Sequence, residues 1–190
     1  CGWHAVRLGA AALSLHLKDA ACHVIGGGAI GVGAALALRA FGATKITVAE
    51  PNALRRATLD QIDGFDAVAP DVVTSADLVI DGVGYAATRA DATKITNPGG
   101  VIMHIGLGEG AGGLDIRRMT LQEISFVGTY TYTAQDFRDT AEAIFDGRLG
   151  ALDWTEQRSL SQGQAAFDDI RAGRVAAPKI ILEPTGDDLA

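Results

Sequence analysis

The segment Val24–Gly33, which reads VIGGGAIGVG, limits the possible folds of this 190-residue chain more than any other stretch. Two β-branched residues lead into three consecutive glycines, and two more glycines follow shortly after. Glycine weakens the interior of both strands and helices, so its accumulation at one junction needs a structural reason. A strand that turns sharply into a closely packed helix supplies that reason.

Gly26, Gly28 and Gly31 match the spacing G-x-G-x-x-G of a strand-to-helix turn that binds dinucleotides. The first glycine permits the tight turn, the second lets the backbone approach a pyrophosphate, and the third lets the helix pack closely on the strand. The N-terminus of the helix then offers free N–H groups and partial positive charge to the phosphates. The motif alone is a weak signal, because Gly27 and Gly33 add chance matches to the same spacing.

The next predicted strand ends at Glu50, about 20 residues beyond the glycine turn, where dinucleotide-binding proteins carry an acid. A carboxylate there accepts hydrogen bonds from the ribose hydroxyls of an adenosine and repels a 2′-phosphate, which favours NAD over NADP. Arg55, one turn into the following helix, is predicted to contact the same ribose. Two alternatives stay open: Glu50 is a solvated strand end, or Arg55 and Arg56 accommodate NADP.

Strands and helices alternate through Gly128, and the strands are continuous apolar runs. This pattern predicts an α/β fold of the Rossmann type, a doubly wound parallel sheet covered by helices on both faces. The predicted strands cover 21–26, 45–50, 65–70, 77–84, 101–108 and 124–133, with a turn at 97–100. The predicted helices cover 3–13, 29–41, 53–62 and 134–145, and a strand near Trp154, a further helix and a strand at 179–184 follow.

Composition argues against several partners and compartments. The formal net charge is −7 and basic residues form no block, so neither nucleic acid nor an anionic membrane is an expected partner. No apolar run is long enough for a membrane span and no signal peptide is visible, so the cytoplasm is the expected compartment. Cys1 and Cys22 are too few for a disulfide framework or a Cys-rich zinc site. The first residues, CGWHAVRLGAAAL, read as a helix already under way, so we expect a piece of a longer protein.

The whole chain resembles the C-terminal half of zinc-type medium-chain alcohol and polyol dehydrogenases, especially the sorbitol, threonine and galactitol dehydrogenase branch. The matching stretches, in order, are CGWHAVRL, VIGGGAIGVGAALALRAFGA, ITVAEPNALRR, DLVIDGVG, GGVIMHIGL, EISFVGTYTYTAQDF and QAAFDDIRAGRVAAPKIILEP. The resemblance implies a Rossmann domain with a leading helix over 1–130. It implies that 131–190 is a return segment of a β-rich catalytic domain whose first half is absent from this sequence.

The resemblance also implies cofactor-binding positions. The backbone of the first helical turn lines the pyrophosphate, the turn after the fourth strand flanks the adenosine and the nicotinamide ribose, and the ends of the last two strands lie by the nicotinamide and its carboxamide. A basic residue in the return segment reaches the cofactor in some members, although a surface lysine is an equal alternative. These positions are Ala29 and Ile30; Val83 and Gly84; Ile105, Gly106 and Leu107; Thr129 and Thr131; and Lys179.

By the same resemblance, the parent enzyme transfers a hydride between a secondary alcohol or polyol and NAD while zinc polarises the oxygen. The zinc ligands and the proton relay belong to the absent half, so we assign no catalytic or metal-ligating residue here and expect this chain alone to be inactive. His104 and Asp81 are interpreted as packing within the sheet and as a polar strand end. An edge strand near Ile124–Gly128 is expected to pair two copies into a homodimer or homotetramer.

Two other functions remain open at this stage. One is a zinc-free, NADPH-dependent medium-chain reductase that acts on quinones or enones, against which Glu50 argues. The other is a module that senses NAD(H) without catalysis, against which the final strand argues, because KIILEP is typical of a segment that rejoins a second domain.

Overall fold

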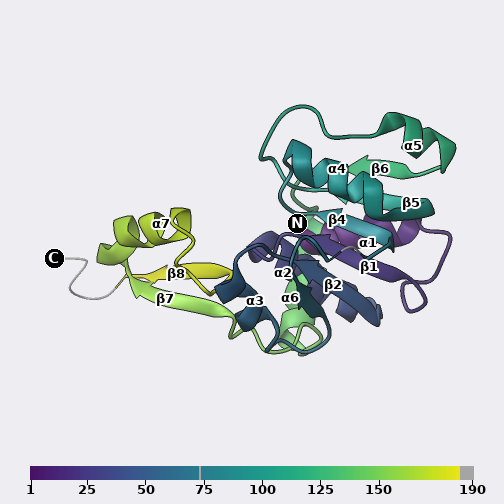
Figure 1. Cartoon of the computed structure of the whole chain (residues 1–190). Helices are drawn as coiled ribbons and strands as arrows, with labels where there is room; N and C mark the ends of the chain where they lie inside the picture. Colours follow the sequence, from purple (N-terminus) through teal and green to yellow (C-terminus); the bar gives the residue numbers. More distant parts are fainter. Residues whose placement is uncertain (73, 185–190) are drawn as a thin grey trace.

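The central element is a six-stranded parallel sheet with the strand order β3-β2-β1-β4-β5-β6 (Figure 1). The structure is a computed structural model, and it describes residues 1–72 and 74–184. This strand order is that of two mononucleotide-binding halves joined between β1 and β4, which confirms the predicted doubly wound Rossmann fold. The strands are β1 Ala21–Ile25, β2 Lys45–Ala49, β3 Asp66–Val68, β4 Ala76–Asp81, β5 Thr96–His104 and β6 Ser125–Gly128.

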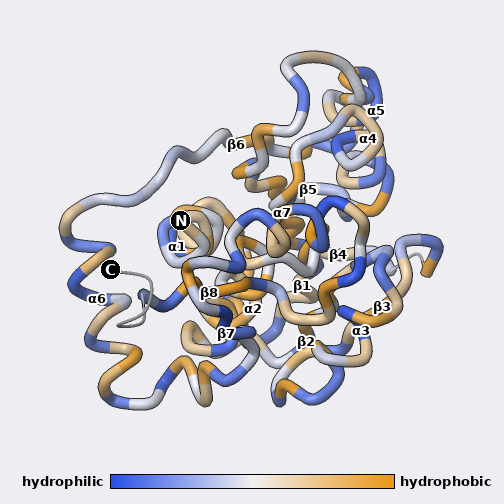
Figure 2. Tube along the Cα trace, turned by 90° about the vertical axis from the view of Figure 1, so that its left-hand side faces the viewer, coloured by the Kyte–Doolittle hydropathy of each residue, from blue (hydrophilic) through white to orange (hydrophobic). Residues whose placement is uncertain are grey.

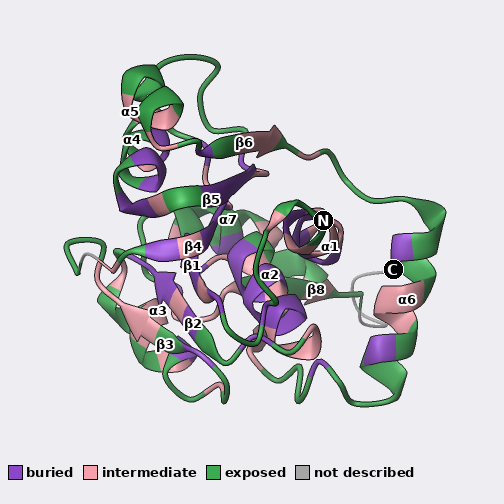
Figure 3. Ribbon diagram, turned by 90° about the vertical axis from the view of Figure 1, so that its right-hand side faces the viewer, coloured by how far each residue is buried: buried purple, intermediate pink, exposed green. Residues whose placement is uncertain are grey.

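Helices cover both faces of the sheet. On one face α1 (Gly2–Ala12), α2 (Ala29–Ala40) and α3 (Ala53–Leu59) contribute to a core with the alternate residues of the strands, and α2 is largely buried (Figure 3). On the other face α4 (Ala86–Ile95) and α5 (Ile116–Leu121) contribute to a smaller core. None of the helices in the described ranges is long and apolar enough to cross a membrane.

Several predicted boundaries need correction. The predicted turn at 97–100 lies inside β5, where pairing with β4 jumps from Thr96 to Val101 and Gly99 has a φ of +71°. The predicted strand 124–133 ends at Gly128, because β5, its pairing partner, ends opposite it at His104. Helices α4 and α5 are missing from the predicted ranges. The buried face of α4 includes the polar Arg89 and Thr93, which hides the apolar periodicity that predicts a helix.

The chain after β6 forms a second group of elements. A long exposed connection leads to α6 (Ala134–Phe145), as Figures 2 and 3 show. Beyond it, β7 (Thr155–Ser159) and β8 (Lys179–Glu183) pair in parallel as a separate two-stranded sheet, with η1 (Leu160–Gln162) and α7 (Gly163–Arg171) between them. Assignment of 131–190 to a second domain stays a prediction, and its last six residues lie outside the described ranges.

Asp136 on α6 joins the second group to α1. Its side chain is 1% exposed and accepts hydrogen bonds from Arg7 Nε at 2.7 Å and Thr133 Oγ1 at 2.6 Å. The Nδ1 atom of His4 lies 2.8 Å from the same carboxylate. The hydrogen bond from Arg7, followed by those from Thr133 and His4, holds the pKa of Asp136 well below its usual range. This carboxylate therefore stabilises the fold in its ionised form.

We predict that Asp136→Asn lowers the free energy of unfolding at pH 7 by about 1–3 kcal/mol, because charge-assisted hydrogen bonds to a buried group are lost. A lowered pKa in the folded state gives stability that is complete above the unfolded value, near 3.9, and is lost as pH falls through the folded value. The difference in the free energy of unfolding between wild type and variant should therefore become smaller below about pH 4.

Chemical denaturation at a series of pH values measures this difference in stability, and Glu142→Gln is a control on the same helix, since Glu142 is exposed. A difference that stays constant down to acid pH would contradict the role assigned to the ionised carboxylate.

Candidate functional site

The carboxyl ends of the parallel strands meet at one edge of the sheet, and backbone hydrogen bonds join them there. Gly26 N donates to Ala49 O at 2.8 Å, and Gly82 N donates to Ile25 O at 3.0 Å. Open α/β sheets bind ligands outside this edge, where the chain leaves β1 in one direction and β4 in the other. The predicted cofactor residues at the strand ends therefore surround this switch point.

The turn between β1 and α2 has the geometry that its glycines predict. Gly26 has a φ of +99°, a backbone conformation that residues with a side chain rarely adopt. A Cβ atom at Gly31 would lie 1.7 Å from the carbonyl oxygen of Gly26, so only glycine lets α2 begin this close to the strand. A Cβ at Gly28 would meet nothing within 4 Å. The outer side of the turn is therefore open in front of the first N–H groups of α2, at Ala29 and Ile30.

Glu50 follows β2 and is 4% exposed, so the interpretation as a solvated strand end is wrong. Its Oε2 accepts from Gly27 N and its Oε1 accepts from Asn52 N, both at 2.9 Å. The guanidinium of Arg55 lies 3.4 Å from Oε2. The carboxylate thus fixes the glycine turn and the start of α3 at the position where an adenosine ribose is expected.

Arg56 does not face the same space. Its guanidinium donates to the carbonyl oxygens of Glu50 at 2.7 Å and Pro51 at 2.8 Å. These two acceptors hold the guanidinium on the backbone, which weakens the alternative that Arg56 accommodates a 2′-phosphate.

Asp81, at the end of β4, organises the second turn of the site. Its side chain is fully buried, and its Oδ1 accepts from both Val83 N and Gly84 N at 2.9 Å. Oδ2 accepts from Thr88 Oγ1 at 2.9 Å. The interpretation of Asp81 as a polar strand end missed this role. Asp followed by Gly-Val-Gly was a usable signal, because Asp side chains often bond the backbone two residues on.

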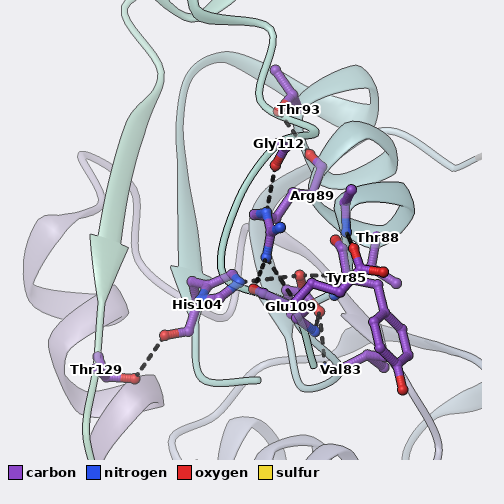
Figure 4. A network of polar contacts seen from close by, with 12 residues as sticks. Val83, Tyr85, Thr88, Arg89, Thr93, His104, Glu109, Gly112 and Thr129 are labelled. Carbon is purple, nitrogen blue, oxygen red and sulfur yellow. Dashed lines mark hydrogen bonds and ion pairs between the residues drawn. The ribbon is translucent and has the colours of Figure 1, made fainter. Parts of the chain in front are cut away.

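His104 lies within the sheet, as interpreted from the sequence. Its Nε2 is 3.6 Å from Asp81 Oδ2, and its ring packs at a tilt against Phe126 with centroids 5.3 Å apart. Its carbonyl oxygen accepts from Thr129 N at 2.9 Å and from Thr129 Oγ1 at 3.4 Å, the contact drawn in Figure 4, which places Thr129 at the end of β6 beside the site.

The turns after β4 and β5 are in direct backbone contact with each other. A Cβ at Gly84 would lie 2.2 Å from the carbonyl atoms of Gly106, and a Cβ at Gly106 would lie 2.1 Å from the carbonyl carbon of Val83. Ile105 N and Gly106 N both donate to Asp81 O, at 2.9 and 3.1 Å. The structure thus brings Val83, Gly84, Ile105 and Gly106 together.

A cavity of about 240 Å³ adjoins the glycine turn on the α4 side of the sheet, lined by Gly26, Pro51, Val83, Tyr85 and His23 among others. His23 Nδ1 lies 2.7 Å from Thr47 Oγ1, and burial lowers the pKa of His23 to about 4, so the imidazole is neutral at physiological pH. A larger hollow of about 680 Å³ opens at the opposite edge, beside Ala21 and Lys45. It contains none of the predicted cofactor residues, whereas Gly26 and Val83 line the smaller cavity, which adjoins both turns and is the candidate subsite.

Three predicted cofactor residues lie outside the group of residues at the strand ends. Leu107 is 83% exposed at the start of the loop after β5, and Thr131 is exposed, with a φ of +50°, on the connection to α6. Lys179 is exposed at the start of β8 in the separate sheet. One contact brings that part of the chain toward the site, since Asn52 Nδ2 donates to Gly173 O at 2.7 Å. In the described ranges, no three His, Cys, Asp or Glu side chains group closely enough to hold a metal ion.

Alanine at Gly31 and alanine at Gly28 should reduce the stability of the fold by very different amounts. Gly31→Ala should cost more than about 3 kcal/mol or prevent folding, because the added Cβ overlaps a backbone oxygen. Gly28→Ala should cost about 1 kcal/mol or less, since its Cβ enters open space. Thermal unfolding followed by circular dichroism compares the two, and equal stability of both variants would contradict the geometry of the turn.

Comparison with known proteins identifies the family of the chain. Residues 29–146 match a family model described as "Zinc-binding dehydrogenase". The probable D-xylulose reductase A of Arthroderma otae is 23% identical over 80% of this chain and 47% of its own length. Acetophenone reductase from Geotrichum candidum, solved with NAD, superposes with a TM-score of 0.82 at 19% identity, over 98% of this chain and 53% of that one.

A zinc-binding dehydrogenase from Sinorhizobium meliloti, solved with NADP and described as putative, superposes with a TM-score of 0.79 at 19% identity, over 96% of this chain and 57% of that one. The chain thus spans about half the length of the relatives that it matches. Since the family model covers more than half of the residues, the chain belongs to the zinc-binding dehydrogenase family.

Proposed function

We propose that this chain is the NAD-binding half of an alcohol or polyol dehydrogenase that depends on zinc. The observation that carries the proposal is the open face of Gly28 in front of the N-terminus of α2, with the buried carboxylate of Glu50 beside it. An open backbone surface with free N–H groups suits a pyrophosphate, and the carboxylate suits the hydroxyls of a ribose. The residues present therefore fit a dinucleotide.

NAD is the cofactor that the charges favour over NADP. The Glu50 carboxylate lies where the ribose is proposed to bind, and a carboxylate there would repel a 2′-phosphate. Arg55 is directed at that carboxylate, and Arg56 is held by backbone carbonyls. The free lone pairs of Glu50 would accept the ribose hydroxyls, and Val83 and Pro51, which line the adjoining cavity, would flank the adenine.

The bound cofactor supplies hydride chemistry, and this chain orients its nicotinamide end. Ile105, Gly106 and Thr129 stand at the strand ends where that end would lie, and Leu107, Thr131 and Lys179 are proposed to contact it from more exposed positions. The names of relatives, among them a D-xylulose reductase, support a small secondary alcohol or polyol as the substrate of the whole enzyme. Zinc and the groups that bind it would come from residues outside this chain.

Assembly and compartment are further parts of the proposal. β6 stands at the end of the strand order, so its outer side is the natural place for pairing with a second copy as a homodimer or homotetramer. The acidic composition and the scarcity of cysteine support a cytoplasmic enzyme.

Titration calorimetry of the 190-residue chain tests the cofactor. We expect NAD to bind about tenfold or more tightly than NADP, because the 2′-phosphate would face a buried carboxylate. Glu50→Gln removes the charge but keeps the shape, so it should shrink this ratio several-fold. The matched control Glu142→Gln, at an exposed position on α6, should leave the ratio unchanged.

Gly28→Ala serves as the loss-of-binding variant, since its methyl group occupies the space proposed for the pyrophosphate. Gly33→Ala is its control, because the Cβ added there also meets nothing within 4 Å. If NADP bound as tightly as NAD, this result would favour the alternative of an NADPH-dependent reductase. Failure of the wild-type chain to bind either dinucleotide would overturn the proposal.

A further inference from the structure

Arg89 is a buried cation that the cofactor site, as described above, does not use. It lies on α4, is 5% exposed, and directs its guanidinium away from the sheet core into the loop after β5 (Figure 4). Nε donates to Gly112 O at 2.6 Å and Nη2 donates to Ala111 O at 2.6 Å. Nη1 donates to Gly84 O at 2.9 Å and Glu109 O at 3.1 Å.

All of these acceptors are backbone carbonyls. In the described part of the chain, no carboxylate lies within ion-pair distance of Arg89, so its charge is balanced by carbonyl dipoles alone. A buried charge is tolerated only when its hydrogen bonds are satisfied, and buried carbonyls need donors in the same way. The guanidinium and the loop therefore stabilise each other's positions.

The same loop has other attachments to the cofactor edge. Glu109 N donates to Gly84 O at 2.8 Å, and Gly108 N donates to Val83 O at 3.2 Å. The Glu109 carboxylate accepts from Ala86 N, the first residue of α4, at 2.9 Å. Gly113 passes so close to α4 that a Cβ there would lie 2.0 Å from Ala86 O. Arg89 adds hydrogen bonds to the same loop from its buried side.

The loop after β5 lies next to the nicotinamide end of the proposed cofactor site. Its first residues, Ile105 to Leu107, come directly after β5, and the carbonyl of Gly84 that Arg89 binds belongs to the turn after β4. The glycine turn and Glu50, at the adenosine end, make none of the hydrogen bonds of Arg89. Loss of Arg89 should therefore disturb the two ends of the site unequally.

We propose that Arg89 is a positioning residue. Its hydrogen bonds hold the 106–112 loop against Gly84, in the conformation that binds the nicotinamide half of the cofactor. The proposal rests on the proposed function. It assigns the guanidinium no contact with the cofactor, since its donors are directed at loop carbonyls. Its effect on binding passes through the loop backbone.

Calorimetric titration of NAD and of ADP into the 190-residue chain and its variants tests this role. Arg89→Gln should weaken NAD binding about tenfold or more, because several charge-assisted hydrogen bonds are lost, while ADP affinity should change less than about threefold. Arg89→Lys keeps the charge but not the forked donors, so it should give an intermediate loss for NAD. It also carries the test if Arg89→Gln fails to fold.

Arg117→Gln is the matched control, since it removes the same charge from an exposed position on α5 and should leave both affinities unchanged. Amide hydrogen exchange gives a readout without any cofactor. Exchange of the Gly108 and Glu109 amides should become at least about tenfold faster in Arg89→Gln, while exchange of Val79 and Ile80 in β4 stays at the wild-type rate.

Equal losses of NAD and ADP affinity would overturn the inference, because they would mean general destabilisation. Unchanged NAD affinity with unchanged exchange at Gly108 and Glu109 would overturn it as well, while the proposed function would stand. Failure of the wild-type chain to bind NAD and ADP would instead overturn the proposed function together with this inference.

Discussion

The approach of α2 to the end of β1 is the constraint on which the rest of the site depends. With the Cβ position of Gly31 only 1.7 Å from Gly26 O, the helix begins in direct backbone contact with the turn. This contact directs the first N–H groups of α2 toward the carboxyl edge of the sheet. It also places Gly27 N at the carboxylate of Glu50, which links the end of β2 to the same turn. One close backbone contact thus positions both the phosphate and the ribose sides of the proposed site.

The loops at this edge are fixed by side chains that satisfy their backbone groups. Glu50 and Asp81 are buried acids. Glu50 accepts from one N–H group of the glycine turn and one at the start of α3, and Asp81 accepts from two N–H groups of the turn after β4. Arg89 does the opposite and donates to carbonyl groups of the next loop. Loops this close to a sheet need such partners, because water cannot reach all of their polar groups. The edge is therefore held in shape by buried charges whose partners are backbone atoms.

Local patterns in the sequence were sufficient to predict part of this structure. The glycine spacing, the position of Glu50 and the apolar strands depend on neighbours along the chain, and the sheet order agrees with them. Helices α2, α3 and α6 begin at the predicted residues, Ala29, Ala53 and Ala134.

Other features depend on distant partners and could not be predicted in this way. Helix α4 was missed because Arg89 is buried by a loop more than 20 residues away, whose carbonyls satisfy a charge that the pattern assigns to solvent. The role of Asp81 was missed for a different reason: its partners Val83 N and Gly84 N are local, but a strand-end acid is ordinarily solvated. Lys179, taken from the family resemblance, begins a strand in a separate sheet, and the hydrogen bond from Asn52 to Gly173 brings that part of the chain toward the site.

An amide chemical-shift map of the chain titrated with NAD would show whether the carboxyl edge of the sheet holds a dinucleotide. We expect the largest changes at Gly28, Ile30, Gly84 and Gly106, with little change at Thr44 and Asp66 beside the larger hollow at the amino edge. Changes concentrated at that amino edge, with the glycine turn unmoved, would contradict this expectation.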